Sequence, residues 1–334
     1  MGNAVAEKKK HRLRLVGIVV LAVLLIAYWV AVNLMVSAAL VPSFMERLDA
    51  FQEVTEVSYS QQVHTSDIQE NRKAALAETR QWLQTAERED WTLTSRDGYR
   101  LVAAVFPRED SHRWAVVLHG YTGWKEEMFP YACRYAAMGY QVLAPDLRCQ
   151  GQSEGDFIGM GYTDRLDVLD WIERILEKDP KAEIVLHGQS MGGACALMMS
   201  GMEELPAAVK AVVSDCAYTD AYSMFRQDIR DWFHLPAFPL VDSANLALQI
   251  RGGYDIKKAS ALEAVRRKSV PVLLIHGDTD RMIPVEMAYA LYDAAAGEKK
   301  LMIVEGAGHA QARDKDPSAF DETVAAFLSK YVGT

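Results

Sequence analysis

The sequence contains few cysteines, and none is spaced as a metal ligand or a disulfide pair. Only four occur among the 334 residues: Cys133, Cys149, Cys195 and Cys216. They form no C-x-x-C pair and have no histidine at zinc spacing, which argues against a disulfide framework and a structural zinc site. We therefore expect the four thiols to act as small buried hydrophobic groups.

Basic residues are also fewer than acidic residues. The 36 Lys and Arg are outnumbered by 45 Asp and Glu, which gives a formal net charge of -9. Nucleic acids are bound mainly through clustered basic side chains. No segment after the first 14 residues gathers such side chains, so the sequence argues against a nucleic-acid partner.

Charge is absent from one long segment near the N-terminus. No charged residue lies between Arg14 and Glu46, and residues 15–41 are almost wholly apolar. This run exceeds the roughly 20 residues that cross a bilayer core, and it is longer than the apolar region of a typical signal peptide. We therefore predict one transmembrane signal-anchor helix over 15–41.

The flanking charges predict the orientation of this helix. Five Lys and Arg lie within residues 7–14, whereas acidic residues outnumber Arg47 just after the run. The positive-inside rule makes 1–14 a cytoplasmic tail and places the remaining chain outside the cell membrane. A cleaved signal peptide is the alternative, because residues 36–39 (VSAA) are small. Burial of the run as a core helix of a soluble protein fits the flanking charges poorly.

Residues 42–90 are polar and contain no strand-like run. Within them, 66–89 starts with Ser-Asp, is rich in helix-favouring residues and has no Gly or Pro. This composition predicts a helical linker that forms a stalk or packs across the following domain, which we expect to span residues 91–334.

Strand and helix signals alternate from residue 91 onward. Two strands, 91–95 and 99–106, are expected to meet at the Asp97-Gly98 turn. Further apolar runs separated by helical stretches follow at 114–120, 140–146, 182–188, 209–215, 271–277 and 300–306. This pattern predicts an α/β fold, with a mostly parallel eight-stranded sheet covered by helices on both faces. Functional residues of such sheets gather at the carboxyl ends of the strands.

Two segments match Gly-x-Ser-x-Gly, at 151–155 and 188–192. A nucleophilic serine needs a sharp strand-to-helix turn with small flanking residues, and helix amides that face the developing oxyanion. Ser190 follows the strand-like AEIVLH and precedes the helix-like MGGACALMMSG. Ser153 precedes a loop-like, glycine-rich segment. We therefore predict Ser190 as the nucleophile and Ser153 as a loop hydroxyl.

A serine nucleophile requires a base, and the chain order in this kind of sheet is Ser, then Asp or Glu, then His. Of eight histidines, only His309 lies beyond the last full strand, which predicts it as the general base. Asp280, in the loop after the penultimate strand, is the favoured acid, which would orient and stabilise the imidazolium. Asp278 and Asp215 remain alternatives.

Two backbone N–H groups are expected to bind the oxyanion. One belongs to Met191, the residue after the nucleophile. The other belongs to Tyr121 in HGYTG (119–123), where the glycines allow the amides to turn toward the site.

The motifs HGYTG, DLRCQGQSEG, HGQSMGG, HGDTDRMIP and GAGHA occur in the order found in the α/β-hydrolase superfamily, which the chain resembles over roughly 91–334. The resemblance implies the α/β-hydrolase fold and its Ser-Asp-His machinery. Longer strings such as GQSEGDFIGMGYTDRLDVLDWI and VEGAGHAQA are similar to membrane-anchored, lysophospholipase-like hydrolases of Gram-positive bacteria. One departure is Cys149, where the superfamily usually has glycine; we expect it to alter a loop at the site entrance.

About 50 residues, 219–269, separate two successive strands, which is more than a crossover needs and predicts a small helical cap. Phe225, Trp232 and Phe233 are candidates to line an apolar substrate pocket in this cap, although such residues also serve only to pack a cap onto its core.

These features lead us to expect a serine hydrolase that cleaves carboxylic esters, acyl or lipid-derived, through an acyl-enzyme, without a cofactor or metal. The expected partners are a small-molecule ester or lipid and the membrane. A serine peptidase or aminopeptidase is one alternative, with Glu154 and Asp156 as weak anchors for a peptide amine. A non-catalytic binding protein on a hydrolase scaffold is the other, and the intact triad argues against it.

Overall fold

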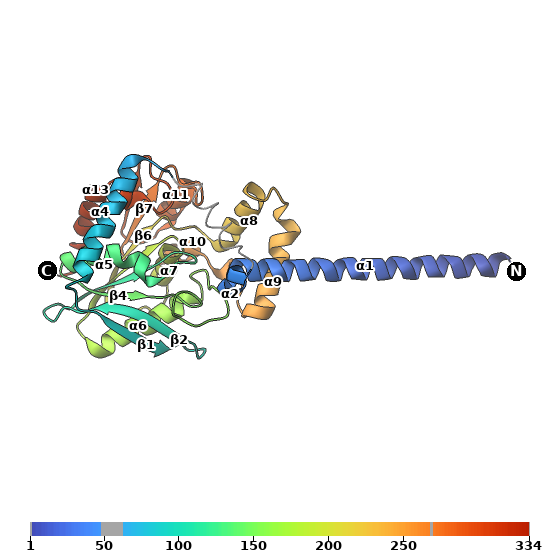
Figure 1. The fold of residues 1–334 in the computed structure, drawn as a ribbon, viewed down its shortest axis with the longest axis horizontal. Helices are drawn as coiled ribbons and strands as arrows, with labels where there is room; N and C mark the ends of the chain where they lie inside the picture. The colour runs from blue at the N-terminus through green and yellow to red at the C-terminus, as the bar shows by residue number, and fades with distance from the viewer. Residues whose placement is uncertain (1, 48–62, 268–269, 334) are drawn as a thin grey trace.

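The computed structural model describes residues 2–47, 63–267 and 270–333. Its longest element, α1 (Gly2–Leu40), projects away from the rest of the molecule (Figure 1). Its apolar side chains are largely exposed between Leu13 and Leu34. The helix therefore has the length and composition of a membrane anchor or a signal sequence. A short helix, α2 (Pro42–Arg47), follows it, and the linker over 48–62 lies outside the described residues.

One eight-stranded sheet forms the centre of the remaining chain, in the order β1-β2-β4-β3-β5-β6-β7-β8. The strands are β1 (Glu89–Thr94), β2 (Arg100–Phe106), β3 (Arg113–Leu118), β4 (Gln141–Pro145), β5 (Glu183–Gln189), β6 (Val209–Asp215), β7 (Val272–Gly277) and β8 (Lys299–Val304). β2 pairs antiparallel with both β1 and β4, and all other neighbours are parallel. The predicted mostly parallel sheet with its starting hairpin is therefore confirmed.

Helices cover both faces of this sheet, as the apolar central strands require. One face packs against α6 (Asp164–Lys178), α7 (Met191–Ser200), α10 (Ala261–Val265) and α11 (Val285–Ala294). The other packs against η1 (Lys125–Met128), α5 (Phe129–Ala137), α12 (Ala312–Lys315) and α13 (Pro317–Leu328). Because both faces are buried, the central strands are apolar at consecutive positions instead of alternating.

The helix predicted over 66–89 is α4 (Ser66–Leu83), which ends earlier than predicted. Residues from Glu89 onward instead pair with β2, because strand pairing in the sheet outweighs intrinsic helix propensity. α4 packs across the domain. Lys315 Nζ lies 2.5 Å from the carboxylate of Asp67, and Arg134 Nη1 lies 2.9 Å from that of Glu78.

Between β6 and β7 the chain forms α8 (Ala221–Asp231), α9 (Ala237–Gly252), η2 (Ile256–Lys258) and α10. Figure 1 shows α8 and α9 beside the end of α1, outside the body formed by the sheet and its helices. α10 differs from them, because its Ala261 and Val265 are buried in the core next to α7. The segment that stands apart is therefore α8–α9, which is shorter than 219–269.

Candidate active site

Ser190 lies at a tight turn between β5 and α7. Its backbone has φ 55° and ψ -117°, a conformation that a non-glycine residue rarely adopts. A Cβ at Gly188 would lie 2.1 Å from the carbonyl oxygen of Gly192, and a Cβ at Gly192 would lie 2.3 Å from that of Leu118. Only glycine at these two positions allows the chain to bend this sharply and present the serine at the carboxyl edge of the sheet.

The structure brings together the three side chains predicted for the triad. His309 Nε2 lies 3.0 Å from Ser190 Oγ, and His309 Nδ1 lies 2.8 Å from Asp280 Oδ2. The other Asp280 oxygen accepts hydrogen bonds from the backbone N–H groups of Met282 (2.9 Å) and Ile283 (2.8 Å), which hold the carboxylate in place. This chain of hydrogen bonds has the geometry needed to activate a serine.

The surroundings of His309 favour its protonated form. Burial opposes the charge, but the Asp280 carboxylate favours it through its charge and its hydrogen bond, and the pKa of His309 is raised well above its ordinary value. Burial likewise opposes ionisation of Asp280, but His309 and His276 outweigh it and lower the pKa of this carboxyl. The pair is therefore suited to stabilise an imidazolium when the histidine accepts a proton.

Neither of the two alternative acids is bonded to His309 in the part of the chain that the structure describes. Asp278 Oδ1 accepts a hydrogen bond from the backbone N–H of Gly306 at 2.7 Å, so it caps its turn. The Asp215 carboxylate is buried, which raises its pKa to about 6, and the backbone carbonyl of the same residue accepts the N–H of Ser190 at 2.8 Å. Within the described residues, His309 bonds Asp280 rather than either of them.

Ser153 is held inside its loop. Its hydroxyl donates to the carbonyl of Asp146 at 2.7 Å and accepts the N–H of Val102 at 3.0 Å. In the same loop, Cys149 has φ 63°, in the left-handed region that favours glycine. That backbone conformation is the physical reason why similar sequences usually have glycine there. The loop nevertheless closes, with the Cys149 N–H donating to the carbonyl of Glu154.

The loop after β3 borders the serine. A Cβ at Gly120 would lie 3.5 Å from the Cβ of Ser190. Buried His119 braces this loop, because its Nδ1 donates to the Gly120 carbonyl at 2.8 Å and its Nε2 accepts the Leu147 N–H at 2.9 Å. Tyr121 follows directly, and its hydroxyl donates to the carbonyl of Ala39 at the end of α1. Sequence reasoning missed this contact.

Met191, the other predicted oxyanion donor, is the first residue of α7. Its backbone N–H is one of the first N–H groups of the helix, which have no partner within the helix. The positive end of the helix dipole lies at the same place, which suits a developing negative charge.

A buried ion pair joins two loops at this edge of the sheet, and the sequence analysis did not find it. Lys125 Nζ lies 2.6 Å from Asp146 Oδ2, with both side chains at most 2 % exposed. Asp146 also accepts the backbone N–H groups of Lys125 (2.7 Å) and Gln152 (2.9 Å). In the sequence, Lys125 is one lysine beside two glutamates, and no periodicity marks it as buried.

The three cap aromatics differ in their surroundings. Phe225 is half-buried against the core, Trp232 is half-buried, and Phe233 is 60 % exposed. Phe233 therefore does not line an enclosed pocket. α8 instead brings Asp228 near the site: burial raises its pKa to about 7, and its charge interacts with His309 and Tyr121.

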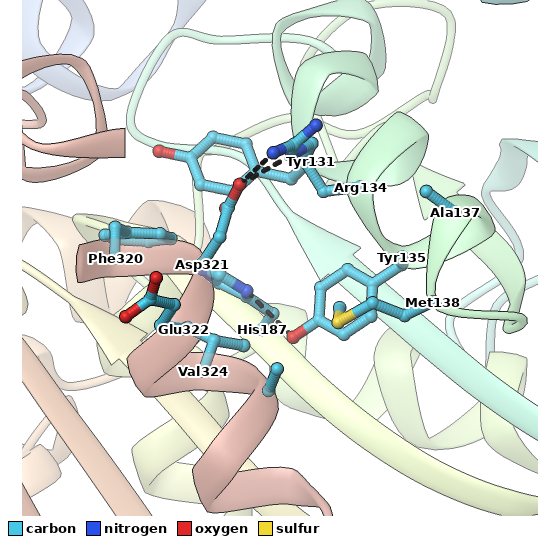
Figure 2. Close-up of a pocket in the computed structure, with 11 residues that line it drawn as sticks. Tyr131, Arg134, Tyr135, Ala137, Met138, His187, Phe320, Asp321, Glu322 and Val324 are labelled. Carbon is cyan, nitrogen blue, oxygen red and sulfur yellow. Dashed lines mark hydrogen bonds and ion pairs between the residues drawn. The ribbon is translucent and has the colours of Figure 1, made fainter. Parts of the chain in front are cut away.

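A hollow of about 340 Å³ lies elsewhere, between α5 and α13 (Figure 2). Its walls include Tyr131, Tyr135 and Phe320, and the Tyr135 hydroxyl lies 3.0 Å from His187 Nδ1. Burial lowers the pKa of His187 to about 3, so this imidazole is neutral. The hollow includes none of Ser190, Asp280 and His309 among its lining residues, so it is separate from the candidate site.

Three side chains near the serine are of types that commonly bind metal ions. The ligand atoms of Cys216, Asp280 and His309 lie within 4.8 Å of one another. Burial raises the pKa of Cys216 to about 11, which leaves the sulfur protonated rather than available as a thiolate ligand. Since Asp280 and Ser190 already bond the imidazole, this donor set suits a hydrogen-bonded histidine better than a metal.

Comparison with known proteins identifies the family. The model described as "Alpha/beta hydrolase family" matches residues 115–325. The chain is 28% identical over 243 residues to YqkD of Bacillus subtilis, covering 72% of this chain and 79% of that protein. It is 24% identical to a thermostable monoacylglycerol lipase of Bacillus sp. H-257, covering 69% and 96%. The Pyrococcus furiosus esterase Pf2001 has a similar fold, with TM-score 0.61, 22% identity and coverage of 75% and 94%.

Proposed function

Because the chain belongs to the alpha/beta hydrolase family, we propose that it is a serine hydrolase that cleaves carboxylic esters through an acyl-enzyme. The observation that carries the proposal is the continuous hydrogen-bonded chain from Ser190 through His309 to Asp280 at a strained strand-to-helix turn. A turn in this conformation is costly and persists where it serves a function.

The geometry supports an ordered sequence of proton transfers. Ser190 Oγ attacks the ester carbonyl while His309 Nε2 takes the hydroxyl proton, and Asp280 stabilises the resulting imidazolium. The N–H groups of Tyr121 and Met191 bind the oxyanion. His309 then returns the proton to the departing alcohol. His309 then takes a proton from water, which attacks the acyl-enzyme. As the acid departs, His309 gives that proton to Ser190 Oγ and the free enzyme is restored.

Ester cleavage is better supported than peptide cleavage. The two carboxylates considered as anchors for a peptide amine have other partners: Glu154 Oε2 accepts the Arg100 N–H at 2.9 Å, and Asp156 accepts the Tyr99 hydroxyl at 2.9 Å. The similar lipase from Bacillus is named for a monoacylglycerol, which is a lipid ester. We therefore favour an acyl or lipid-derived ester as the substrate.

The proposal includes α1 as an uncleaved membrane anchor. Its last residues contact the domain: Ser37 Oγ accepts Arg251 Nη2 at 2.7 Å, and the Leu40 carbonyl accepts the Ile158 N–H at 2.9 Å. Cleavage within 36–39 would remove most of these contacts. The charges on either side of the helix support a cytoplasmic N-terminus and a domain outside the membrane.

Hydrolysis of p-nitrophenyl esters from acetate to palmitate, by the full chain in detergent micelles, tests the proposed chemistry. We expect Ser190→Ala to lose several orders of magnitude in kcat/KM, because the nucleophile is removed. Ser153→Ala is the matched control, since it changes the other Gly-x-Ser-x-Gly motif, and it should remain active.

Two results would contradict the proposal. One is a folded Ser190→Ala protein with wild-type activity. The other is a folded wild-type protein that hydrolyses none of the esters. That result would favour hydrolysis of peptide amides, or ligand binding without catalysis, as the function.

A further inference from the structure

The surface of α8–α9 is unusually apolar. Five large hydrophobic side chains are between 47% and 71% exposed and form what we call the cap patch: Phe233, Leu235, Phe238, Leu246 and Ile250. Outside α1 and this patch, the described chain has only three other exposed large hydrophobic side chains, and each is less exposed than those of the patch: Leu76 (42%), Trp124 (44%) and Tyr289 (45%). Exposed apolar side chains concentrated in one part of a molecule commonly mark a site of association.

This surface lies directly beside the candidate membrane helix. The Tyr28 hydroxyl donates to Ser243 Oγ at 2.9 Å, and Arg251 of α9 donates to the carbonyl of Asn33 at 2.8 Å and to Ser37 Oγ. Figure 1 shows α9 crossing α1 in its C-terminal part, while the sheet lies farther along the same axis.

The contacts between α1 and α9 set the depth of α9 in a bilayer. A bilayer core of about 30 Å needs about 20 helical residues, and every such window between Leu15 and Val41 contains both Tyr28 and Asn33. Leu34 is the last strongly exposed apolar residue of α1, whereas Val36 and Leu40 are buried by the domain. Lipid contact therefore ends near Leu34, and Tyr28 lies about 9 Å inside that boundary.

The charges on α9 match this depth. Between Leu235 and Ile250 the only charged residue is Asp242, and it is neutralised by Lys257 at 3.2 Å and by a hydrogen bond from the Tyr222 hydroxyl. Arg251, just beyond this stretch, bonds α1 near the point where lipid contact ends. Long basic side chains at such a position reach the head groups.

We propose that the cap patch is inserted into the lipid bilayer that α1 crosses, in the leaflet next to the domain. α8 and α9 then lie in the membrane interface, and the domain is held in one orientation by two attachments instead of one. α1 alone leaves the whole molecule free to tilt in the bilayer and to turn about the helix axis, whereas an inserted patch excludes that freedom.

The insertion also specifies the route of the substrate. Gly120 borders Ser190, and the hydroxyl of the next residue, Tyr121, is bonded to Ala39, so the serine lies near the end of α1. The charge of Asp228 on α8 also acts on His309. Resting on the ester hydrolysis proposed above, we assign the substrate to carboxylic esters whose acyl chain resides in that leaflet. Such a substrate reaches Ser190 without passing through water.

Spin labels on the full chain in lipid nanodiscs test the insertion. Labels at Phe238→Cys and Ile250→Cys should collide readily with oxygen, which concentrates in lipid, and poorly with a water-soluble nickel chelate. Leu76→Cys and Tyr289→Cys, at exposed apolar positions on α4 and α11, are the matched controls and should show the opposite preference.

Free access of the nickel chelate to positions 238 and 250 would overturn the proposal. Shielding of both positions from both reagents would overturn it as well, because that result indicates a contact with protein, such as a second copy of the chain. This readout involves no catalysis, so it is independent of whether the ester-hydrolase proposal holds.

The route is tested with Phe238→Ser combined with Ile250→Ser. Hydrolysis of a long-chain ester embedded in vesicles should fall about tenfold or more, because apolar burial in the leaflet is lost, while hydrolysis of soluble p-nitrophenyl acetate stays unchanged. Equal loss on both substrates, or on neither, would contradict the leaflet route. Inactivity of the wild type on both esters would refute the proposed function and leave the insertion result standing.

Discussion

At the scale of single residues, the proposed chemistry depends on the charge of His309. Its two ring nitrogens are committed to different partners, Asp280 on one side and Ser190 on the other. Asp280 is held in turn by two backbone N–H groups, so the imidazole cannot rotate without breaking several hydrogen bonds. A general base in this position must be neutral before it accepts the serine proton.

The pH dependence of the reaction follows from this requirement. The pKa of His309 is raised, so activity should be lost as pH falls through a midpoint above the ordinary histidine value of about 6.5. Asp280→Asn removes the carboxylate that favours the imidazolium, so the midpoint should move to lower pH and kcat should fall about four orders of magnitude. The pH profile of kcat/KM measures both.

Asp278→Asn is the control, because Asp278 lies in the same loop and bonds Gly306 instead of the histidine. The Asp278→Asn substitution should leave the pH profile of kcat/KM unchanged. An Asp280→Asn protein with the wild-type midpoint and rate would show that Asp280 does not act on His309.

At the scale of elements, the candidate site depends on the short segments that connect the strands. The loop after β3 and the loop after β4 are joined by the pair of Lys125 and Asp146, which is almost completely buried. Two charges removed from water stabilise a fold only while both are present, because either one alone remains buried and unpaired. The pair therefore makes the position of one loop dependent on the other.

Lys125→Met should lower the free energy of unfolding by about 3–5 kcal/mol, since it leaves the Asp146 carboxylate uncompensated. For a domain of this size, the expected fall in Tm is about 10 °C, measured by calorimetry on the full chain in detergent. Lys181→Met, at an exposed position, is the control and should change Tm little. Equal Tm values for the two variants would show that the buried pair does not stabilise the fold.

At the scale of the whole molecule, α1 and the domain act as one unit. The end of α1 is buried by the domain at Val32, Val36 and Leu40, while the rest of the helix exposes apolar side chains, as a membrane anchor or a signal sequence does. A helix whose two parts have such different surroundings suits a chain that is both attached to a bilayer and packed against its own anchor.

The topology is tested with tags at both ends of the full chain in intact cells stripped of their wall. External protease should remove the C-terminal tag and spare the N-terminal one, because the basic residues precede the helix. Alkaline carbonate should leave the protein in the membrane. A shorter chain released into the medium, starting near residue 40, would instead indicate a cleaved signal peptide.

The sequence by itself determined the alternating strands and helices, the apolar length of α1, and the turn around Ser190, because each is recorded in local period, composition or motif. Chain order also led to His309 and Asp280, which the structure brings within hydrogen-bond distance of each other. These features can be predicted from neighbouring residues alone, or from the known direction of the strands in a parallel sheet.

Only the tertiary structure decided the end of α4 at Leu83, the burial of Lys125, the exposure of Phe233 and the contact of Tyr121 with Ala39. Each depends on a partner that lies far away in the chain or on the packing of a whole layer, and no local pattern records it. A polar or aromatic residue has the same appearance in a sequence whether it is buried, exposed or bonded to a helix more than 80 residues away, because its surroundings exist only once the chain has folded.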